Sequence, residues 1–248
     1  MFTLIGWTES QDSAVLVNVA ALADPHVRVS GDDVIVPADV PRIATVYASG
    51  LNIDRAQLIS PSLRRILNLE ISPLDVALEP TFPTPLLDLR FNTIGLDPEE
   101  ALDAQAAEIG AGATRCTILC WLADKNIEVI SGDIRSTRAT NTTALVANAW
   151  TNGALTFTDT LPAGKYAVVG GRFFSAGLQA WRLVFVGYTW RPGAIGADTV
   201  ADPDRDLFRY GNFGVWGTFN HNTPPTVDFL SASADTSQIG VLDLIKIE

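Results

Sequence analysis

The chain has 248 residues, a formal net charge of −11, 47% hydrophobic residues and only 18% charged residues. Its length suits one large all-β domain or two domains of about 120 residues each. The acidic balance and the lack of any run of basic residues exclude a protein that holds nucleic-acid phosphates directly with a basic patch. The high hydrophobic content fits either a large core or a chain that buries further surface by self-association.

The first 25 residues contain an apolar run but lack the pattern of a signal peptide. No basic region precedes the run, and Glu9 and Asp12 lie ahead of it, whereas a secretory leader begins with positive charge. We expect a first strand within residues 13–22 instead. No apolar stretch has the length of a membrane-spanning helix.

Short β-branched runs separated by turn residues dominate the first 95 residues. Residues 27–36 contain two such runs around a Ser-Gly-Asp-Asp turn, which predicts a hairpin, and residues 42–48 predict another strand. Residues 63–71 fit either a short helix or a strand. Four prolines within residues 73–85 favour an extended, irregular arm or crossover.

Residues 97–108 have the pattern of a helix. Asp97 suits the N-cap, Pro98 the first helical position, and Glu100 completes a capping box. Strong helix formers follow, and two glycines lie beyond them. The sequence therefore predicts one connecting helix within residues 96–112, near the middle of the chain.

The chain beyond this helix again consists of short predicted strands. Residues 113–123 form the first, and Asn152-Gly153 is the strongest turn signal. Residues 154–193 predict three strands joined by short turns: residues 155–158 alternate apolar and polar side chains, residues 165–170 are β-branched and aromatic, and residues 179–190 form a long strand. Two further strands, within residues 226–230 and 241–247, close the chain.

This distribution of strands predicts an all-β fold of two antiparallel β-sandwich units. The units would span residues 1–95 and 113–248, with the short helix of residues 96–112 near their junction. No residue-level repeat relates the two halves, so the division depends on the strand count and on the helix. One large sandwich is the alternative.

The two cysteines, Cys116 and Cys120, lie in the sequence TRCTILCWLA. On a strand they face the same side but stand about 13 Å apart, which is too far for a disulfide. Without histidine or further cysteine nearby they make a poor zinc site. We expect buried free thiols, consistent with folding in a reducing cytoplasm.

The two histidines, His26 and His221, both lie in predicted loops. A hydrolytic site would require His221 to pair with Asp228 or Asp206, held by a rigid neighbour. A surface position is the expectation for His221. The sequence therefore predicts no catalytic residue and no enzyme.

An acidic segment, DTVADPDRD, spans residues 198–206 and resembles the start of a calcium-binding loop. It lacks the glycine and the downstream glutamate of an EF-hand, and Pro203 and Arg205 interrupt it. A solvated acidic loop is the expectation, with no metal and no cofactor bound. The acidic residues concerned are Asp198, Asp202, Asp204 and Asp206.

The six tryptophans are scattered along the chain, which indicates core or interface packing more than a row of sugar-stacking rings. They are Trp7, Trp121, Trp150, Trp181, Trp190 and Trp216.

The segment LPAGKYAVVGGRFFSAGLQAWRLVF, followed by RPG, resembles the central strands of the second jelly roll in the double jelly-roll major capsid proteins of tailless icosahedral bacteriophages, the tectivirus and corticovirus kind. The layout of two β units, a junction helix, an acidic chain and free cysteines extends the resemblance over the whole chain. This family is defined by architecture and has no invariant catalytic or binding motif. The resemblance implies two jelly rolls in each chain, three copies in a pseudo-hexagonal capsomer, and capsomers that tile an icosahedral shell.

The same resemblance implies the location and the partners. The protein would be part of a virion assembled in the host cytoplasm. Its contacts would be with other copies of itself, as a homotrimer and laterally between capsomers, and with other virion proteins. In some relatives the shell covers an internal membrane, and no direct contact with nucleic acid is expected.

Two other functions compete with this one. A carbohydrate-binding or receptor-binding β-sandwich module of a phage would show an exposed row of aromatic side chains and a measurable affinity for sugars. An enzyme on a β scaffold would need His221 with an aspartate partner, or a metal ion in the acidic loop.

Overall fold

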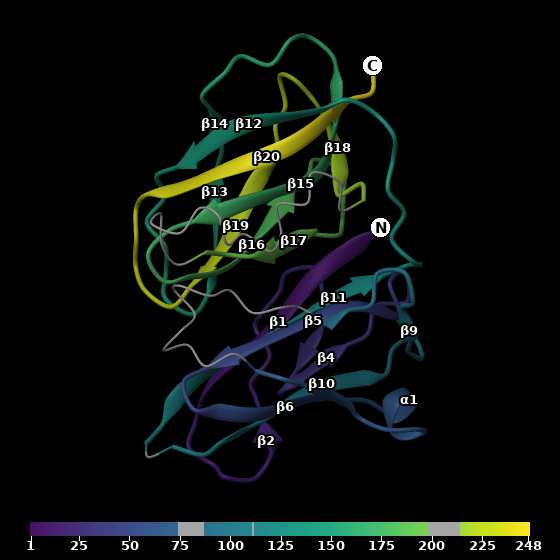
Figure 1. Ribbon diagram of the computed structural model, residues 1–248, viewed down its shortest axis with the longest axis vertical. Helices are drawn as coiled ribbons and strands as arrows, with labels where there is room; N and C mark the ends of the chain where they lie inside the picture. The colour runs from purple at the N-terminus through teal and green to yellow at the C-terminus, as the bar shows by residue number, and fades with distance from the viewer. Residues whose placement is uncertain (74–86, 111, 198–213) are drawn as a thin grey trace. The chain divides into compact units, whose positions relative to one another are not determined.

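Nearly all the regular structure is β-strand, as expected from the sequence (Figure 1). The computed structural model describes residues 1–73, 87–110, 112–197 and 214–248. The chain divides into two units, which we call the first unit (Thr3–Asn126) and the second unit (Ile127–Glu248 together with Met1–Phe2). The prediction of an all-β sandwich fold is confirmed.

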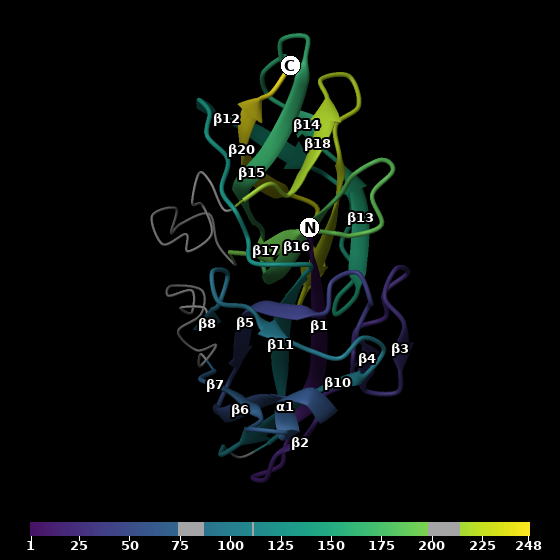
Figure 2. The ribbon, with the colours of Figure 1, turned by 90° about the vertical axis from the view of Figure 1, so that its right-hand side faces the viewer.

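The first unit contains two sheets (Figures 1 and 2). One has the order β1 (Phe2–Gln11), β11 (Thr114–Ala123), β5 (Arg42–Gly50) and β8 (Leu87–Asp88), with β9 (Ile94–Gly95) also paired to β5. The other has the order β3 (Val29–Ser30), β4 (Asp33–Ile35), β10 (Ala101–Glu108), β6 (Ile53–Ile59) and β7 (Leu69–Ile71), with β2 (Val17–Asn18) paired to β10.

The second unit also contains two sheets. One has the order β14 (Thr156–Phe157), β12 (Ile134–Asn141), β20 (Gln238–Lys246), β15 (Lys165–Phe174) and β18 (Gly217–Asn220). The other has the order β13 (Trp150–Ala154), β19 (Thr226–Ser231), β16 (Leu178–Val184) and β17 (Gly193–Ile195).

Each unit has the strand order of a jelly roll. With strands lettered B to I in chain order, a jelly roll has the sheets B-I-D-G and C-H-E-F. In the first unit β1-β11-β5-β8 is the B-I-D-G sheet, and β2, β10, β6 and β7 form C-H-E-F. In the second unit the corresponding sheets are β12-β20-β15-β18 and β13-β19-β16-β17. The two units therefore repeat one topology, although no repeat is visible in the residues.

The predicted helix of residues 96–112 is wrong. Ala101–Glu108 is strand β10, which pairs antiparallel with β6 along its length and with β4 and β2 on its other side. Leu102, Ala104 and Ala106 are buried, so the segment alternates with the period of a strand. Pairing on both sides outweighs the helix propensity of its alanines.

This correction moves the boundary between the units. Strand β10 pairs with β6, and β11 pairs with β5, so both strands belong to the first unit. That unit therefore extends to Asn126, and the second begins at Ile127. The sequence-based division into residues 1–95, 96–112 and 113–248 is therefore replaced. A short helix lies elsewhere: α1 (Pro61–Arg64) overlaps the start of residues 63–71, which fit either a helix or a strand, and β7 ends that segment.

Of two other local predictions, the hairpin is confirmed and the Asn-Gly turn is wrong. The hairpin of residues 27–36 is formed by β3 and β4. Asn152 and Gly153, expected in a turn, lie inside β13, where a Cβ at Gly153 would stand 2.1 Å from Asn141 Nδ2. The turn lies just before β13, at Asn148, whose φ of 59° is left-handed.

Aromatic side chains form the centre of the second unit. The ring of Trp181 lies 4.8 Å from that of Phe173 and 5.2 Å from that of Trp216, and Phe173 also contacts Phe229 at 5.3 Å between centroids. Trp181, Phe173 and Phe229 are fully buried. These rings join strands of both sheets and close the sandwich.

Candidate functional site

A buried ionic cluster lies on the C-H-E-F sheet of the second unit. The carboxylate of Asp228 accepts hydrogen bonds from Arg182 Nε at 2.9 Å, from Asn152 Nδ2 at 2.8 Å, and from Arg191 Nη1. The side chains of Arg182 and Asp228 are 0% and 3% exposed. The guanidinium of Arg182 also lies 4.1 Å from the centre of the Trp150 ring, a cation–π contact.

Strand register creates this cluster. Asn152 of β13 and Arg182 of β16 both stand opposite Asp228 of β19, so the three side chains lie in one row across the sheet. Because side chains alternate along a strand, the row occupies the face opposite the core residues Trp181 and Phe229. The cluster connects three strands through their side chains.

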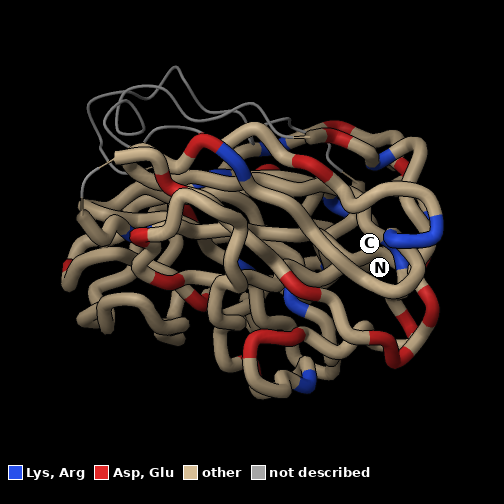
Figure 3. The backbone as a smooth tube through the Cα atoms, turned by 90° about the horizontal axis from the view of Figure 1, so that it is seen from below, with Lys and Arg blue, Asp and Glu red and all other residues tan. Residues whose placement is uncertain are grey.

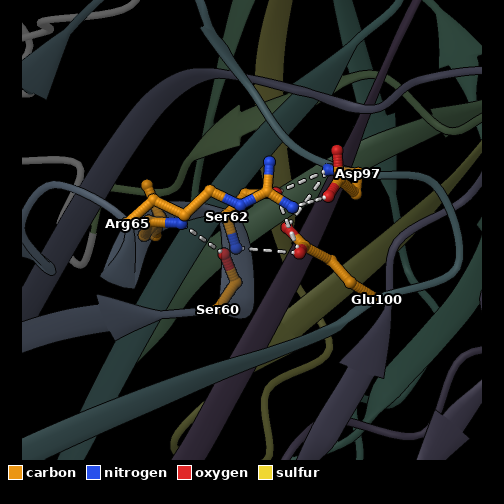
Figure 4. Close-up of polar contacts among 6 residues, drawn as sticks. Ser60, Ser62, Arg65, Asp97 and Glu100 are labelled. Carbon is orange, nitrogen blue, oxygen red and sulfur yellow. Dashed lines mark hydrogen bonds and ion pairs between the residues drawn. The ribbon is translucent and has the colours of Figure 1, made fainter.

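A second polar cluster ties α1 to the residues before β10 (Figure 4). Glu100 Oε2 accepts from the backbone N and the Oγ of Ser62, at 3.0 and 2.9 Å. Ser60 caps the helix by accepting from Leu63 N at 3.1 Å, and Arg65 pairs with Asp97. Asp97 and Glu100, predicted to cap a helix of their own, thus hold α1 in place.

Two carboxylates face each other across β4 and β10 in the first unit. Ala101 and Leu102 stand opposite Ile35 and Val34, and the same register brings Asp103 to Asp33. Burial, and then the hydrogen bond and the negative charge of Asp33, raise the pKa of Asp103 to about 7. Near neutral pH Asp103 is therefore partly protonated, whereas the same carboxyl in the unfolded chain would have released its proton.

The substitution Asp103→Asn is expected to stabilise the protein at pH 8 by about 1 kcal/mol, a value reduced for the partial exposure of the side chain. Because the folded-state pKa of Asp103 is raised from its ordinary value to about 7, its contribution to stability is fully present below about pH 4 and is lost as the pH rises through 7. Denaturant unfolding from pH 4 to pH 8 should show a decline in stability for the wild type and a flatter profile for the variant. The exposed Asp54 on β6 supplies the control Asp54→Asn, and equal profiles for wild type and Asp103→Asn would contradict the raised pKa of Asp103.

The cysteines lie as predicted. Cys116 and Cys120 are buried free thiols on β11. Burial raises the pKa of the Cys116 thiol to about 12 and that of Cys120 further. Both are therefore protonated and inert at neutral pH, because the thiolate is the reactive form.

Native protein at pH 8 is expected to react with a disulfide reagent such as DTNB at least about a hundredfold more slowly than a model thiol. The same protein in guanidinium chloride should release two equivalents of chromophore at once. Rapid labelling of the folded protein would show that β11 is accessible and would contradict this arrangement.

The fold gives His221 and Asp228 different hydrogen-bond partners. His221 is exposed just after β18, where its Nδ1 accepts from Gly164 N at 3.3 Å. Asp228 belongs to the arginine cluster, and Asp206 lies outside the described residues, as does the whole acidic segment 198–206. Most of the proline-rich segment, residues 74–85, is also outside them. Among the residues that the structure describes, no group of three or more His, Cys, Asp and Glu is placed to hold a metal ion.

The tryptophans mostly pack in the cores, as the sequence indicated. Trp7, Trp121 and Trp181 are fully buried and Trp216 is 4% exposed. Trp150 lies against Arg182.

Charged residues are dispersed over the described chain. Figure 3 shows Lys and Arg distributed singly or in small groups among Asp and Glu. Several exposed pairs have opposite signs, such as Arg55 with Glu70 at 3.1 Å and Arg28 with Glu99 at 3.0 Å. No helix within the described ranges is long and apolar enough to cross a membrane.

The ionic cluster was detectable in the sequence in one respect. Arg182 and Asp228 each interrupt an apolar strand, in AWRLVF and TVDFL, and a charge in such a place is buried only when it is paired. Their pairing with each other, 46 residues apart, depends on the strand order, which the sequence does not display.

No protein-family model and no curated protein matches the chain. Among solved structures, the chain is similar to the major capsid protein P2 from Bacteriophage PM2, with 10% sequence identity and a TM-score of 0.24. The similarity covers 100% of this chain and 98% of that chain. The jelly-roll topology of the two units follows from their strand pairing and does not depend on this comparison.

Proposed function

We propose that the protein is a structural virion protein, a double jelly-roll major capsid protein whose chains trimerise into capsomers. The observation that carries the proposal is the repeated topology, with a B-I-D-G and a C-H-E-F sheet in each unit. Jelly rolls occur in viral capsids, lectins and cupins, and fold alone does not assign a function. Two consecutive copies in one chain favour the capsid, because three chains then supply six similar domains to a pseudo-hexagonal building block.

The buried cores of both units support this role. Each closes its sandwich with fully buried aromatic and aliphatic side chains, including Trp7 and Trp121 in the first unit and Trp181 in the second. The Asp228 cluster connects β13, β19 and β16 of the second unit by side-chain bonds in addition to the strand ladder. A shell subunit requires such fixed domains, since its lateral contacts repeat many times.

Exposed apolar side chains offer contacts between copies. Ile66 and Leu67, directly after α1, are 87% and 78% exposed. A contact that covered both side chains would remove this apolar surface from water. We propose that this pair lies at a contact between chains of the trimer.

Light scattering on the purified protein tests the proposal. A chain of 26.6 kDa should give a trimer of about 80 kDa, or larger particles, at micromolar concentration. A wild-type monomer up to high concentration would contradict the capsid function and would favour a single-copy binding module.

A pair of variants locates the contact. The double variant Ile66→Glu/Leu67→Glu should lower the mass toward the monomer, because it places two charges in the contact. Ile109→Glu is the matched control, since Ile109 is 69% exposed and lies on another loop. A trimer that persists in the double variant would exclude Ile66 and Leu67 from the contact.

A further inference from the structure

The connection between β16 and β17 of the second unit begins with a turn that presents an apolar side chain to solvent. Tyr188 N donates to Phe185 O at 3.2 Å, and Gly187 has a φ of 80°, as at the third position of a type II β-turn. Phe185 is 3% exposed and anchors the turn in the core, whereas Val186 at its tip is 85% exposed. We call residues 185–188 the β16–β17 turn.

The side chain of Tyr188 extends this surface and is itself held in place. Its ring centroid lies 5.4 Å from that of Phe185, and its hydroxyl lies 3.1 Å from Thr218 Oγ1 of β18, a hydrogen bond in which either oxygen can donate. Tyr188 nevertheless remains 39% exposed. A side chain that is already restrained loses little conformational entropy when a partner covers it, and tyrosine is enriched among the residues that contribute most to protein–protein binding.

The two stretches of chain that meet at this turn carry no charge. Residues 185–190 and 217–225 contain no Asp, Glu, Lys or Arg, although these four types make up 18% of the chain. The next cation along the chain, Arg191, is 14% exposed and pairs with Asp228. Because the centre of a protein–protein interface is depleted of charge and enriched in aromatic side chains, this composition favours a protein partner over a phosphate or a metal cation.

The charge of the whole chain indicates which protein this partner is. Each chain carries a formal charge of −11, so two copies repel each other where their acidic surfaces approach. A basic partner would gain most from the acidic part of the surface. A partner of the same sign is repelled least at an uncharged surface, and another copy of this chain meets that condition.

We propose that the β16–β17 turn contacts a second copy of the chain, at a lateral contact between capsomers that is separate from the contact at Ile66 and Leu67. The inference rests on the proposed function, which requires both kinds of contact. One turn is small beside the roughly 800 Å² that each partner buries in a stable pair of proteins. A contact of this size is sufficient where it repeats around a capsomer, because many weak contacts then act together.

Sedimentation velocity over a range of protein concentrations tests the contact. The variant is Val186→Glu, and the matched control is Val146→Glu, since Val146 is 60% exposed between β12 and β13 and receives the same charge. Both substitutions are at exposed positions, so circular dichroism should show wild-type folding. Trimers of Val186→Glu should keep their mass but associate with one another at least about tenfold more weakly, because the contact would bury an unpaired carboxylate. Val146→Glu should behave as the wild type does.

The outcomes separate this contact from the proposed function. A wild-type monomer would contradict the capsomer and, with it, the lateral contact. Wild-type trimers whose further association equals that of Val186→Glu would overturn the lateral contact alone. Dissociation of Val186→Glu into monomers would also overturn it, since the turn would then belong to the contact within the trimer. An equal weakening by Val146→Glu would assign the effect to added charge in general and would overturn the proposal as well.

Discussion

Replacement of Asp228 by alanine is expected to lower the free energy of unfolding of the second unit by about 3–5 kcal/mol. The substitution removes the carboxylate that Arg182 and Arg191 both contact, while Arg182 remains fully buried. A buried guanidinium deprived of its counter-charge retains the full cost of desolvation. Denaturant unfolding followed by circular dichroism, with the slope of the transition checked for constancy, measures the loss.

Glu70→Gln is the control for this experiment. Glu70 pairs with Arg55 at 3.1 Å, but both side chains are more than half exposed, and exposed pairs contribute less than about 1 kcal/mol. A loss for Asp228→Ala no larger than that of Glu70→Gln would show that the arginines reach solvent and that the cluster is not closed.

Trp181→Ala is expected to destabilise the second unit by about 3–5 kcal/mol. Trp181 is fully buried and touches the rings of Phe173 and Trp216, which come from the opposite sheet and from the segment before β18. Its removal leaves a cavity between the two sheets that rigid strands cannot fill. The midpoint of urea unfolding, monitored by circular dichroism, provides the measurement.

Val186→Ala provides the contrast in the same region of the chain. Val186 follows β16 and is 85% exposed, so its truncation should change the stability by less than about 0.5 kcal/mol. Similar stabilities of Trp181→Ala and wild type would contradict the described core of the second jelly roll.

The strands were predictable where one feature dominated the local sequence. The hairpin of residues 27–36 has a Ser-Gly-Asp-Asp turn between β-branched runs, and the alternation in residues 241–247 matches β20. Strand β1 was missed, because residues 2–11 form one apolar-rich segment with no turn signal at its start.

The wrong prediction of a helix within residues 96–112 has a specific cause. Asp97, Pro98 and Glu100 match the pattern of a helix start, but the carboxylate of Glu100 accepts from Ser62 of α1, and that of Asp97 pairs with Arg65 at the end of α1. The alternation of Leu102, Asp103, Ala104 and Gln105 was visible, yet alanine carries little weight in either pattern. Only the pairing with β6 and β4 decides between strand and helix.

The buried ionic cluster arises from the order of the strands, and no sequence motif marks it. The row of Asn152, Asp228 and Arg182 exists because β13, β19 and β16 are neighbours. Its members are not adjacent in the sequence, and none of them has a characteristic spacing.

Electron cryomicroscopy of the purified oligomer tests the capsid proposal most directly. Three chains with two jelly rolls each should give a threefold particle with six domains of similar size around its axis. Two-dimensional class averages with this six-lobed outline are the expected result. Particles of a single two-domain chain, or a twofold dimer, would contradict the proposed capsomer.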